Sequence, residues 1–273
     1  MNVISTNSFV IIDQKDLTND EILNEKLTKA CSIGFFYLEI PEDCKKLIEN
    51  TIEFANSFYK NEVIKNLRFG REEFSGYHDR KYQVESLYLE QKYWQEAYVP
   101  VEVGKLAEKM TNIAIDLLKK TLSFCCIPKE KWNLTTGGLT EGKGMVHFSL
   151  NHYRPEKEQE GLDAHRDFNQ VTVLFINQLG LQAKVNGEWT DVPPLKDRFV
   201  INFGRTIETL VNNPKQLIAA EHRVQKVTKD RISFGIFADN EMESDVYERS
   251  REGNLVKVET YREYIKKCFA ETY

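Results

Sequence analysis

The chain has 273 residues, of which 41% are hydrophobic and 29% charged, and its formal net charge is −5. This composition is typical of a folded globular protein and excludes a disordered or fibrous one. The acidic balance argues against a surface that neutralises many phosphates, so we expect no nucleic-acid partner. No apolar run approaches the roughly 18 residues of a membrane helix, and no basic stretch followed by an apolar segment opens the chain. We therefore expect a cytoplasmic protein without membrane contact.

Two short strands and three amphipathic helices are predicted in the first half of the chain, in the order strand 8–12, helix 18–33, strand 35–40, helix 42–58 and helix 101–125. Gly34 is suited to end the first helix in a left-handed conformation. Residues 68–94 are rich in aromatic and charged side chains, which predicts a loop and strand region over a pocket. We expect residues 1–131 to pack as one region on a following core.

Short strands dominate the second half of the chain, and they are predicted at 145–153, 170–176, 181–185, 188–192, 199–203 and 231–238. Asn186-Gly187 is the strongest hairpin signal in the sequence. Many short strands at regular spacing indicate a sandwich or jelly-roll barrel, here over residues 132–240. The charged run 241–254 is predicted to be a solvated loop and the end of the chain a helix, which together form a C-terminal segment over 241–273. We expect the three segments to form a single compact unit.

The five cysteines, an odd number without CxxC spacing, favour free thiols over a disulfide framework or a thiolate zinc site.

His165 and Asp167 are one residue apart, and on an extended strand both side chains point to the same side. His222 precedes another predicted strand, and a barrel could bring it opposite the pair. Two imidazoles and one carboxylate that leave coordination positions open are typical of Fe(II) oxygenases. A chain with this many histidines and acidic residues contains about one His-x-acid pair by chance, so the pair needs support from elsewhere.

That support comes from Arg231 and Ser233, which share one face of the strand predicted after His222. An inward arginine in an apolar barrel is costly unless it is paired, and a guanidinium beside a hydroxyl is a receptor for a carboxylate. A diacid could chelate iron at one end and meet Arg231 at the other. Asn151 and Tyr153 share a face of an earlier strand and could donate to the same carboxylate or orient a substrate.

In its motifs and their order, the sequence resembles the isopenicillin N synthase-like branch of the Fe(II)/2-oxoglutarate-dependent dioxygenases. The resemblance spans nearly the whole chain and is carried by the segments "NHYRP", "DAHRD", "GLQ", "GEW", "INFG", "EHRV" and "RISFGIF". Two positions depart from the family pattern. Many members have Gly-Asp where this chain has Gly204-Arg205, and Arg166 stands where a small or polar residue is usual.

The resemblance implies a mainly β fold with flanking helices around a double-stranded β-helix core of the jelly-roll, cupin-like type. It implies Fe(II) held by His165, Asp167 and His222, and 2-oxoglutarate held by Arg231, Ser233, Tyr153 and Asn151. The implied reaction consumes O2 and oxidises a small molecule, with hydroxylation expected, and it releases succinate and CO2. Family members that halogenate lack the carboxylate corresponding to Asp167, so halogenation is not expected.

Four further residues are candidates for substrate contacts. His147 shares the face of Asn151 and Tyr153, and Phe237 shares the face of Arg231 and Ser233. Arg166 and Arg205 are suited to an acidic substrate. Each has an ordinary alternative: a core histidine, core packing, or an arginine that is solvated or ion-paired. The sequence specifies neither the substrate nor the oligomeric state.

Three other functions stay open at this point. The first is an oxidase of the isopenicillin N synthase type, which needs no 2-oxoglutarate and carries out desaturation or ring closure. The second is a zinc hydrolase, because two histidines and an aspartate also suit that ion. The third is a barrel that binds a ligand without turnover.

Overall fold

The structure is a computed structural model that describes residues 9–61, 75–96, 98–211, 213 and 216–272. Its helices are α1 (Asp20–Ile33), α2 (Glu42–Phe58), α3 (Val101–Phe124), α4 (Trp132–Thr135), α5 (Arg205–Val211) and α6 (Tyr261–Thr272). Its strands are β1 (Val10–Ile12), β2 (Phe35–Glu39), β3 (Gly76–Asp79), β4 (Val84–Glu90), β5 (Met145–Tyr153), β6 (Leu162–His165), β7 (Val171–Ile176), β8 (Leu181–Val185), β9 (Glu188–Asp191), β10 (Arg198–Phe203), β11 (His222–Val224), β12 (Arg231–Asp239), β13 (Asp245–Arg249) and β14 (Leu255–Thr260).

Two sheets build the core. The larger sheet has the strand order β1-β2-β10-β7-β12-β5-β4-β3, and the smaller one has the order β6-β11-β8-β9. The pairing is antiparallel throughout these sheets except between β1 and β2. The predicted mainly β fold with a double-stranded β-helix core and flanking helices is confirmed. Strands from the first 131 residues extend the larger sheet at both of its edges.

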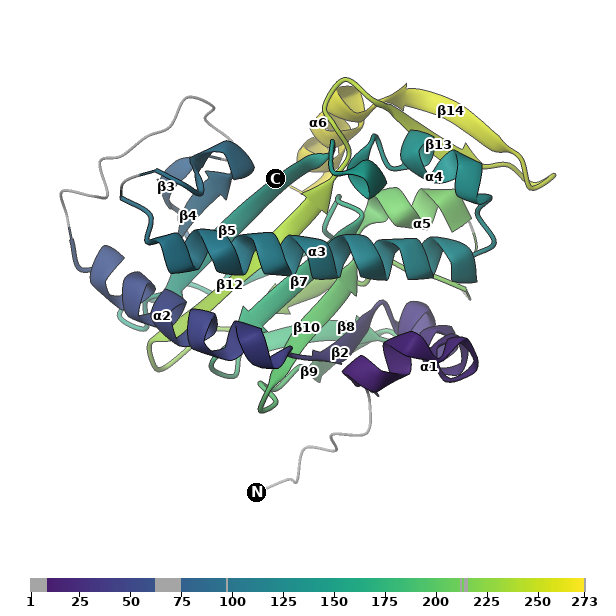
Figure 1. Ribbon diagram of the computed structural model, residues 1–273. Coiled ribbons are helices and arrows are strands. Elements are labelled where there is room, and N and C mark those ends of the chain that lie inside the picture. Colours follow the sequence, from purple (N-terminus) through teal and green to yellow (C-terminus); the bar gives the residue numbers. More distant parts are fainter. Residues whose placement is uncertain (1–8, 62–74, 97, 212, 214–215, 273) are drawn as a thin grey trace.

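The alternation of side chains along β12 separates the two faces of the larger sheet. Ile232, Phe234 and Ile236 are buried in the hydrophobic core that the sheet shares with α3. Figure 1 shows α3 running across this face, with α2 beside it. Burial of each such side chain contributes about 1.5–3 kcal/mol of transfer free energy. The intervening residues Arg231 and Ser233 therefore face the smaller sheet, as the period of two predicted.

A second hydrophobic cluster fills the space between the sheets, and its members include Phe35, Val200, Leu181, Ala183 and Val224. These side chains come from β2 and β10 of the larger sheet and from β8 and β11 of the smaller one. The interior of the barrel is thus apolar. A charged group inside it needs a partner.

Two predicted turns have the expected backbone conformation. Asn186 and Gly187 have positive φ values of 51° and 86° and join β8 to β9 in a hairpin. Gly34 ends α1 with a φ of 79°. A Cβ atom at Gly34 would lie 2.6 Å from the backbone oxygen of Ile218, so a larger residue there would also clash. All five cysteines are free, as predicted.

The prediction of a solvated loop over residues 241–254 is wrong. Residues 245–249 form β13, which pairs with β14 in an antiparallel hairpin. Val246 is 1% exposed and belongs to a small cluster with Tyr261 and Ile265 of α6. The many charged residues of this run suggested full solvation, but Val246 is buried and packs the hairpin against α6. Among the described residues, no helix combines the length and apolar character that a membrane span requires.

Candidate active site

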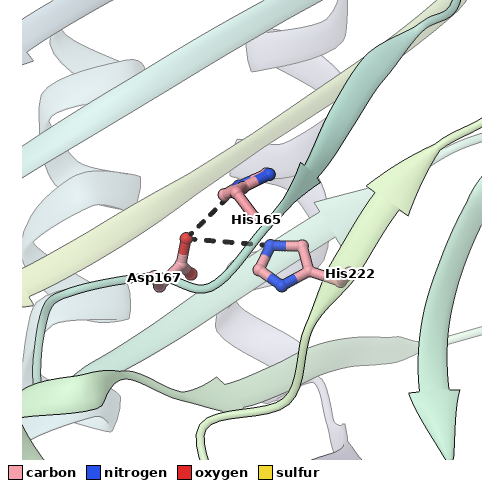
Figure 2. A group of neighbouring side chains, drawn as sticks. All are labelled: His165, Asp167 and His222. Carbon is pink, nitrogen blue, oxygen red and sulfur yellow. Dashed lines mark ion pairs between the residues drawn. The ribbon is translucent and has the colours of Figure 1, made fainter. Parts of the chain in front are cut away.

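The smaller sheet brings the three predicted metal ligands together. His165 ends β6 and His222 begins β11, and the two residues lie directly opposite each other in the register of these paired strands. Asp167 follows two residues after β6. One ligand atom from each of the three residues lies within 4.8 Å of the others. Oδ1 of Asp167 is 3.6 Å from Nε2 of His165 and 3.7 Å from Nε2 of His222. Dashed lines in Figure 2 mark these two pairs.

Backbone carbonyls orient both imidazoles. Nδ1 of His165 lies 2.8 Å from the carbonyl oxygen of Asp163, and Nδ1 of His222 lies 3.1 Å from that of Ala220. A carbonyl can only accept, so each Nδ1 carries the ring proton and donates it. The lone pair is then on Nε2, the atom turned toward Asp167. This is the arrangement in which histidines bind metals.

Two neutral side chains hold the carboxylate in place. Oδ2 of Asp167 accepts hydrogen bonds from Oγ1 of Thr172 at 2.7 Å and from Nδ2 of Asn202 at 2.8 Å. Both donors are buried, and they leave Oδ1 directed at the imidazoles. Sequence reasoning missed these two residues. Their only signal was a polar side chain inside each of two apolar strands, β7 and β10.

The protonation states of His165 and Asp167 suit a cation. Burial, with His222 close by, lowers the pKa of His165 to about 4, so its imidazole is neutral at neutral pH. For Asp167, burial acts to raise the pKa, but the two histidines and the hydrogen bonds from Asn202 and Thr172 outweigh it and leave the pKa below its usual value. Neutral imidazoles and an ionised carboxylate are the forms that bind metal.

Arg231 lies at the start of β12 and is 1% exposed. Its guanidinium carbon is 4.5 Å from the ring centre of Tyr153, Nη1 donates to Oγ of Ser233 at 3.3 Å, and Nε donates to the carbonyl of Gln178 at 3.4 Å. Within the described part of the chain, no carboxylate forms an ion pair with it. Burial lowers the pKa of Arg231. A buried guanidinium whose partners are all neutral is costly, so an anionic ligand would stabilise it.

Two cavities meet at the triad, and His165 and Asp167 line both. The smaller one, of about 60 Å³, extends from the triad to Arg231, Ser233 and Tyr153. The larger one measures about 140 Å³ and is lined by Arg80, Val84, Ser86, Tyr88, His147, Ser149, Asn151, Leu162, His165, Asp167, Phe168, Asn169 and Phe237. Its wall includes β4, in agreement with the prediction of strands over a pocket. The earlier part of that predicted region, residues 68–74, lies outside the described residues.

The four candidate substrate residues divide into two pairs. His147 and Phe237 line the larger cavity. Arg166 and Arg205 line neither cavity. The Arg166 guanidinium forms an ion pair with Glu208 and donates from Nε to the carbonyl of Ala219 at 2.6 Å. The alternative of an ion-paired arginine therefore accounts for its contacts.

Asn151 lines both cavities, because it stands on β5 beside the triad. Its Oδ1 accepts hydrogen bonds from Oγ of Ser86 at 2.7 Å and from Oγ of Ser149 at 3.0 Å. With the oxygen occupied in this way, the amide nitrogen is the group that Asn151 can offer to a ligand, and it is a donor.

The segment that carries this site matches the model of a known family. Residues 145–240 match the model of the 2OG-Fe(II) oxygenase superfamily. Codeine O-demethylase of Papaver somniferum is 30% identical over 147 residues, which cover 51% of this chain and 38% of that protein. DMR6-like oxygenase 2 of Arabidopsis thaliana is 25% identical over 263 residues, or 85% and 73% of the two chains. The chain thus matches less than two fifths of the length of the first relative.

Solved structures share the fold over almost the full length. The dioxygenase for auxin oxidation from rice superposes with a TM-score of 0.78 at 18% identity, covering 97% of this chain and 96% of the other. A putative 2OG-Fe(II) oxygenase family protein from Caulobacter crescentus gives a TM-score of 0.79 at 18% identity, covering 97% of this chain and 99% of the other. The family match spans the strands that carry the triad and Arg231.

Proposed function

We propose that the protein is a non-haem Fe(II)- and 2-oxoglutarate-dependent dioxygenase that oxidises a small molecule, by hydroxylation in the simplest case, with release of succinate and CO2. One observation carries the proposal: a cavity connects a triad of two imidazoles and a carboxylate with a buried guanidinium that has no anionic partner among the described residues. An open cation site next to a receptor for a distal carboxylate suits a chelating diacid.

The donor set fits ferrous iron, and His165, Asp167 and His222 would hold it. Two nitrogens and one carboxylate oxygen are the ligands of the facial arrangement that leaves positions open for co-substrates. The bound iron would supply the O2 chemistry that no side chain can provide. Backbone carbonyls that accept from Nδ1 of the two histidines orient the imidazoles. Hydrogen bonds from Thr172 and Asn202 orient the carboxylate, so the three ligand atoms are directed to one point.

The other residues around the triad bind and orient. Arg231 and Ser233 would pair with the distal carboxylate of 2-oxoglutarate, and Tyr153 packs against the guanidinium and limits its movement. Asn151 would donate its amide N–H to the same co-substrate. The apolar layer between the sheets excludes water from this end of the site, which strengthens the charged contacts. His147 and Phe237 are the proposed substrate contacts, because they line the larger cavity.

Net charge and cysteine chemistry support the finer parts of the proposal. The charge of −5 is unfavourable for binding nucleic acid, which supports a small molecule as the substrate. Five free cysteines are compatible with a reducing compartment, and we propose a cytoplasmic location.

The test measures co-substrate consumption by the purified protein. Anaerobic addition of 2-oxoglutarate to the Fe(II)-loaded protein is expected to produce a visible charge-transfer band, and admission of O2 is expected to yield succinate and CO2 in equal amounts. A preparation loaded with Zn(II) is the matched control and should produce neither. Oxygen uptake without succinate would replace the proposal by a 2-oxoglutarate-independent oxidase. Absence of both the band and oxygen uptake would reject an iron enzyme.

A further inference from the structure

The imidazole of His147 is held in one orientation in the wall of the larger cavity. It is 3% exposed and stands on β5, on the same face as Asn151. The ring stacks on Phe237 of β12, with ring centres 4.9 Å apart and planes 3° apart. His147 and Phe237 are partners in the register of the two strands, so backbone pairing fixes the stack. Strand pairing and the stack on Phe237 thus hold the imidazole in the cavity wall.

A carboxyl group stands behind this imidazole. Asp239, at the end of β12, is fully buried, and its Oδ2 is 3.5 Å from Nδ1 of His147. Its Oδ1 accepts a hydrogen bond from the hydroxyl of Tyr261, the first residue of α6. Within the described part of the chain, Oδ2 makes no hydrogen bond of its own. The carboxyl is therefore anchored by Tyr261 on one side and turned to His147 on the other.

The burial of this pair decides where its protons lie. Burial raises the pKa of Asp239 to about 8, so the group is mainly a neutral acid at pH 7. Burial lowers the pKa of His147 to about 4, so the imidazole is neutral as well. Because Oδ1 accepts from Tyr261, the acid proton is best placed on Oδ2, where it can be donated to Nδ1 of His147. The ring proton of His147 is then on Nε2, which makes this atom a donor.

The same cavity contains other donors and is small. Arg80 contributes a guanidinium, which also donates from Nη2 to the hydroxyl of Tyr88 at 2.9 Å. Asn151 offers its amide nitrogen, since Ser86 and Ser149 occupy its oxygen. The volume of about 140 Å³ is close to the roughly 150 Å³ of a cavity known to accept benzene. Donors on several sides of a ring-sized space favour a compact ligand that carries acceptor oxygens.

We propose that His147 is a specificity-determining residue that donates from Nε2 to a carboxylate oxygen of a substrate about the size of one ring, and that Asp239 and Tyr261 are positioning residues that set its tautomer. The inference rests on the proposed function, because it assigns the larger cavity to the substrate. Arg80 supplies the positive charge that favours a carboxylate over a neutral acceptor.

Binding of ring-sized probes tests the ligand class. Benzoate, benzamide and benzylamine are titrated calorimetrically into the anaerobic protein loaded with Fe(II) and 2-oxoglutarate. Benzoate is expected to bind tightest and benzylamine not measurably. In His147→Leu, benzoate binding should weaken roughly 10- to 100-fold, the loss expected for one hydrogen bond to a charged group. His147→Gln, which keeps a donor near the position of Nε2, should restore most of it.

Asp239 variants test how the tautomer is set. Asp239→Asn keeps a donor toward Nδ1 and an acceptor toward Tyr261, so benzoate should bind it within about threefold of the wild type, a small change on the scale of one hydrogen bond. Asp239→Leu removes both and should match His147→Leu. Nitrogen-15 NMR of the wild-type protein provides a readout that needs no variant to fold, and it should show the His147 proton on Nε2.

The outcomes separate this inference from the proposed function. If no charge-transfer band forms in the wild type, the proposed function fails. If the band forms, any of three results overturns the inference alone: benzoate does not bind, it binds His147→Leu as tightly as the wild type, or the NMR signal places the proton on Nδ1.

Discussion

The two faces of the β4–β5 pair differ in how their buried polar residues are paired. On the outer face, Glu85 and His152 are register partners, and the His152 ring lies against Tyr59, the residue that follows α2. Their neighbours Ser86 and Asn151 pair on the cavity side. Glu85 is 1% exposed, accepts from the hydroxyl of Tyr77 at 2.5 Å, and lies 2.7 Å from Nδ1 of His152. The outer face therefore holds a buried charge whose partners all come from the chain itself.

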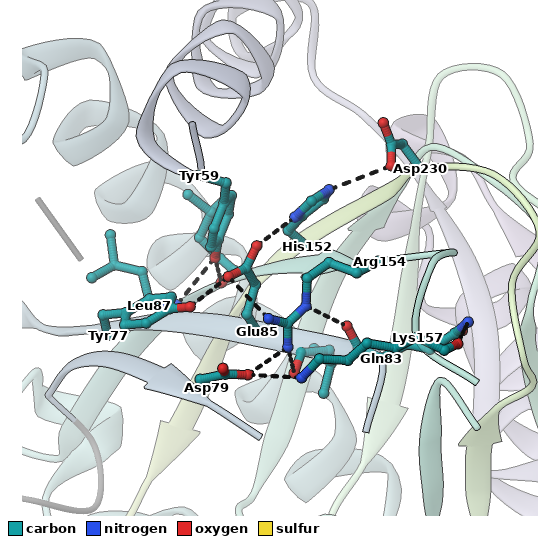
Figure 3. Close-up of polar contacts among 12 residues, drawn as sticks. Tyr59, Tyr77, Asp79, Gln83, Glu85, Leu87, His152, Arg154, Lys157 and Asp230 are labelled. Atoms are coloured by element: carbon teal, nitrogen blue, oxygen red, sulfur yellow. Dashed lines mark hydrogen bonds and ion pairs between the residues drawn. The ribbon is translucent and has the colours of Figure 1, made fainter. Parts of the chain in front are cut away.

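Figure 3 shows the charged residues on this outer face, which we call the outer cluster: Asp79, Glu85, His152, Arg154 and Lys157. Nη1 of Arg154 is 3.6 Å from Glu85, and its Nη2 is 2.6 Å from Asp79, which also pairs with Lys157 at 3.0 Å. Every charge in the cluster meets an opposite charge. Arg231, on the cavity side, meets only neutral groups within the described residues. Burial of a charge alone therefore does not indicate function. A buried charge without an opposing one indicates a ligand.

The largest expected effect follows from removing the carboxylate of the triad. Asp167→Ala should abolish ferrous iron binding and succinate formation, because two imidazoles alone leave an incomplete site. Iron titration monitored by calorimetry provides the measurement. Asp79→Ala removes a carboxylate from the outer cluster and is the control that should retain iron. Retained iron affinity in Asp167→Ala would contradict the assignment of this residue as a ligand.

Replacement by methionine is expected to have opposite effects on stability at Arg231 and at Arg154. Arg231→Met should lower the affinity for 2-oxoglutarate by roughly 30- to 1,000-fold, as expected for loss of a buried charge pair. The same change should raise the unfolding free energy of the ligand-free protein by about 1–3 kcal/mol, because it removes an unpaired buried charge. Arg154→Met breaks paired contacts and should instead destabilise by about 1–3 kcal/mol, with unchanged 2-oxoglutarate affinity.

Denaturant unfolding with and without 2-oxoglutarate measures both effects of the arginine changes. Destabilisation by Arg231→Met to the same extent as by Arg154→Met would mean that the chain itself supplies the missing partner of Arg231. The buried charges on the two faces would then both be paired within the chain.

A smaller effect is expected from the residues that orient Asp167. Thr172→Val removes one of the two hydrogen bonds to Oδ2 at nearly constant volume. We expect iron affinity to fall by about 10- to 100-fold, the usual result of losing a group that orients a metal ligand. Thr121→Val deletes a buried hydroxyl that donates to the carbonyl of Leu117 in the same helix, and it serves as the control. Equal iron affinities in the two variants would exclude an orienting role for Thr172.

The smallest functional effect is expected from Glu85→Gln in the outer cluster. The change removes the negative charge shared by His152 and Arg154. Unfolding free energy should fall by about 1–3 kcal/mol, because the half-buried guanidinium of Arg154 loses part of its compensation. The affinities for iron and 2-oxoglutarate should stay at the wild-type values. A weakened 2-oxoglutarate complex would show that the outer cluster also shapes the cavity.

Local periodicity accounts for the part of the site that could be predicted. Arg231 and Ser233 are two residues apart on β12, and the geometry of an extended strand alone turns such a pair to one side. His165 and Asp167 have the same spacing, although Asp167 lies two residues beyond the end of β6. The same rule put His147, Asn151 and Tyr153 on one face, with His152 on the other. Turn positions could also be predicted from local sequence, as the left-handed conformations of Gly34 and Gly187 confirm.

Contacts between distant strands were decided only by the tertiary structure. Asn202 reaches Asp167, and Tyr261 reaches Asp239, through strand registers and helix positions that no local pattern specifies. Arg166 carries the charge expected of a substrate contact, yet its side chain pairs with Glu208. The β13–β14 hairpin depends on a single buried valine. Sequence alone determines which side of a strand a residue occupies, because backbone geometry is local. Which residues meet across the barrel depends on pairing over long sequence separations, and that follows only from packing the whole chain.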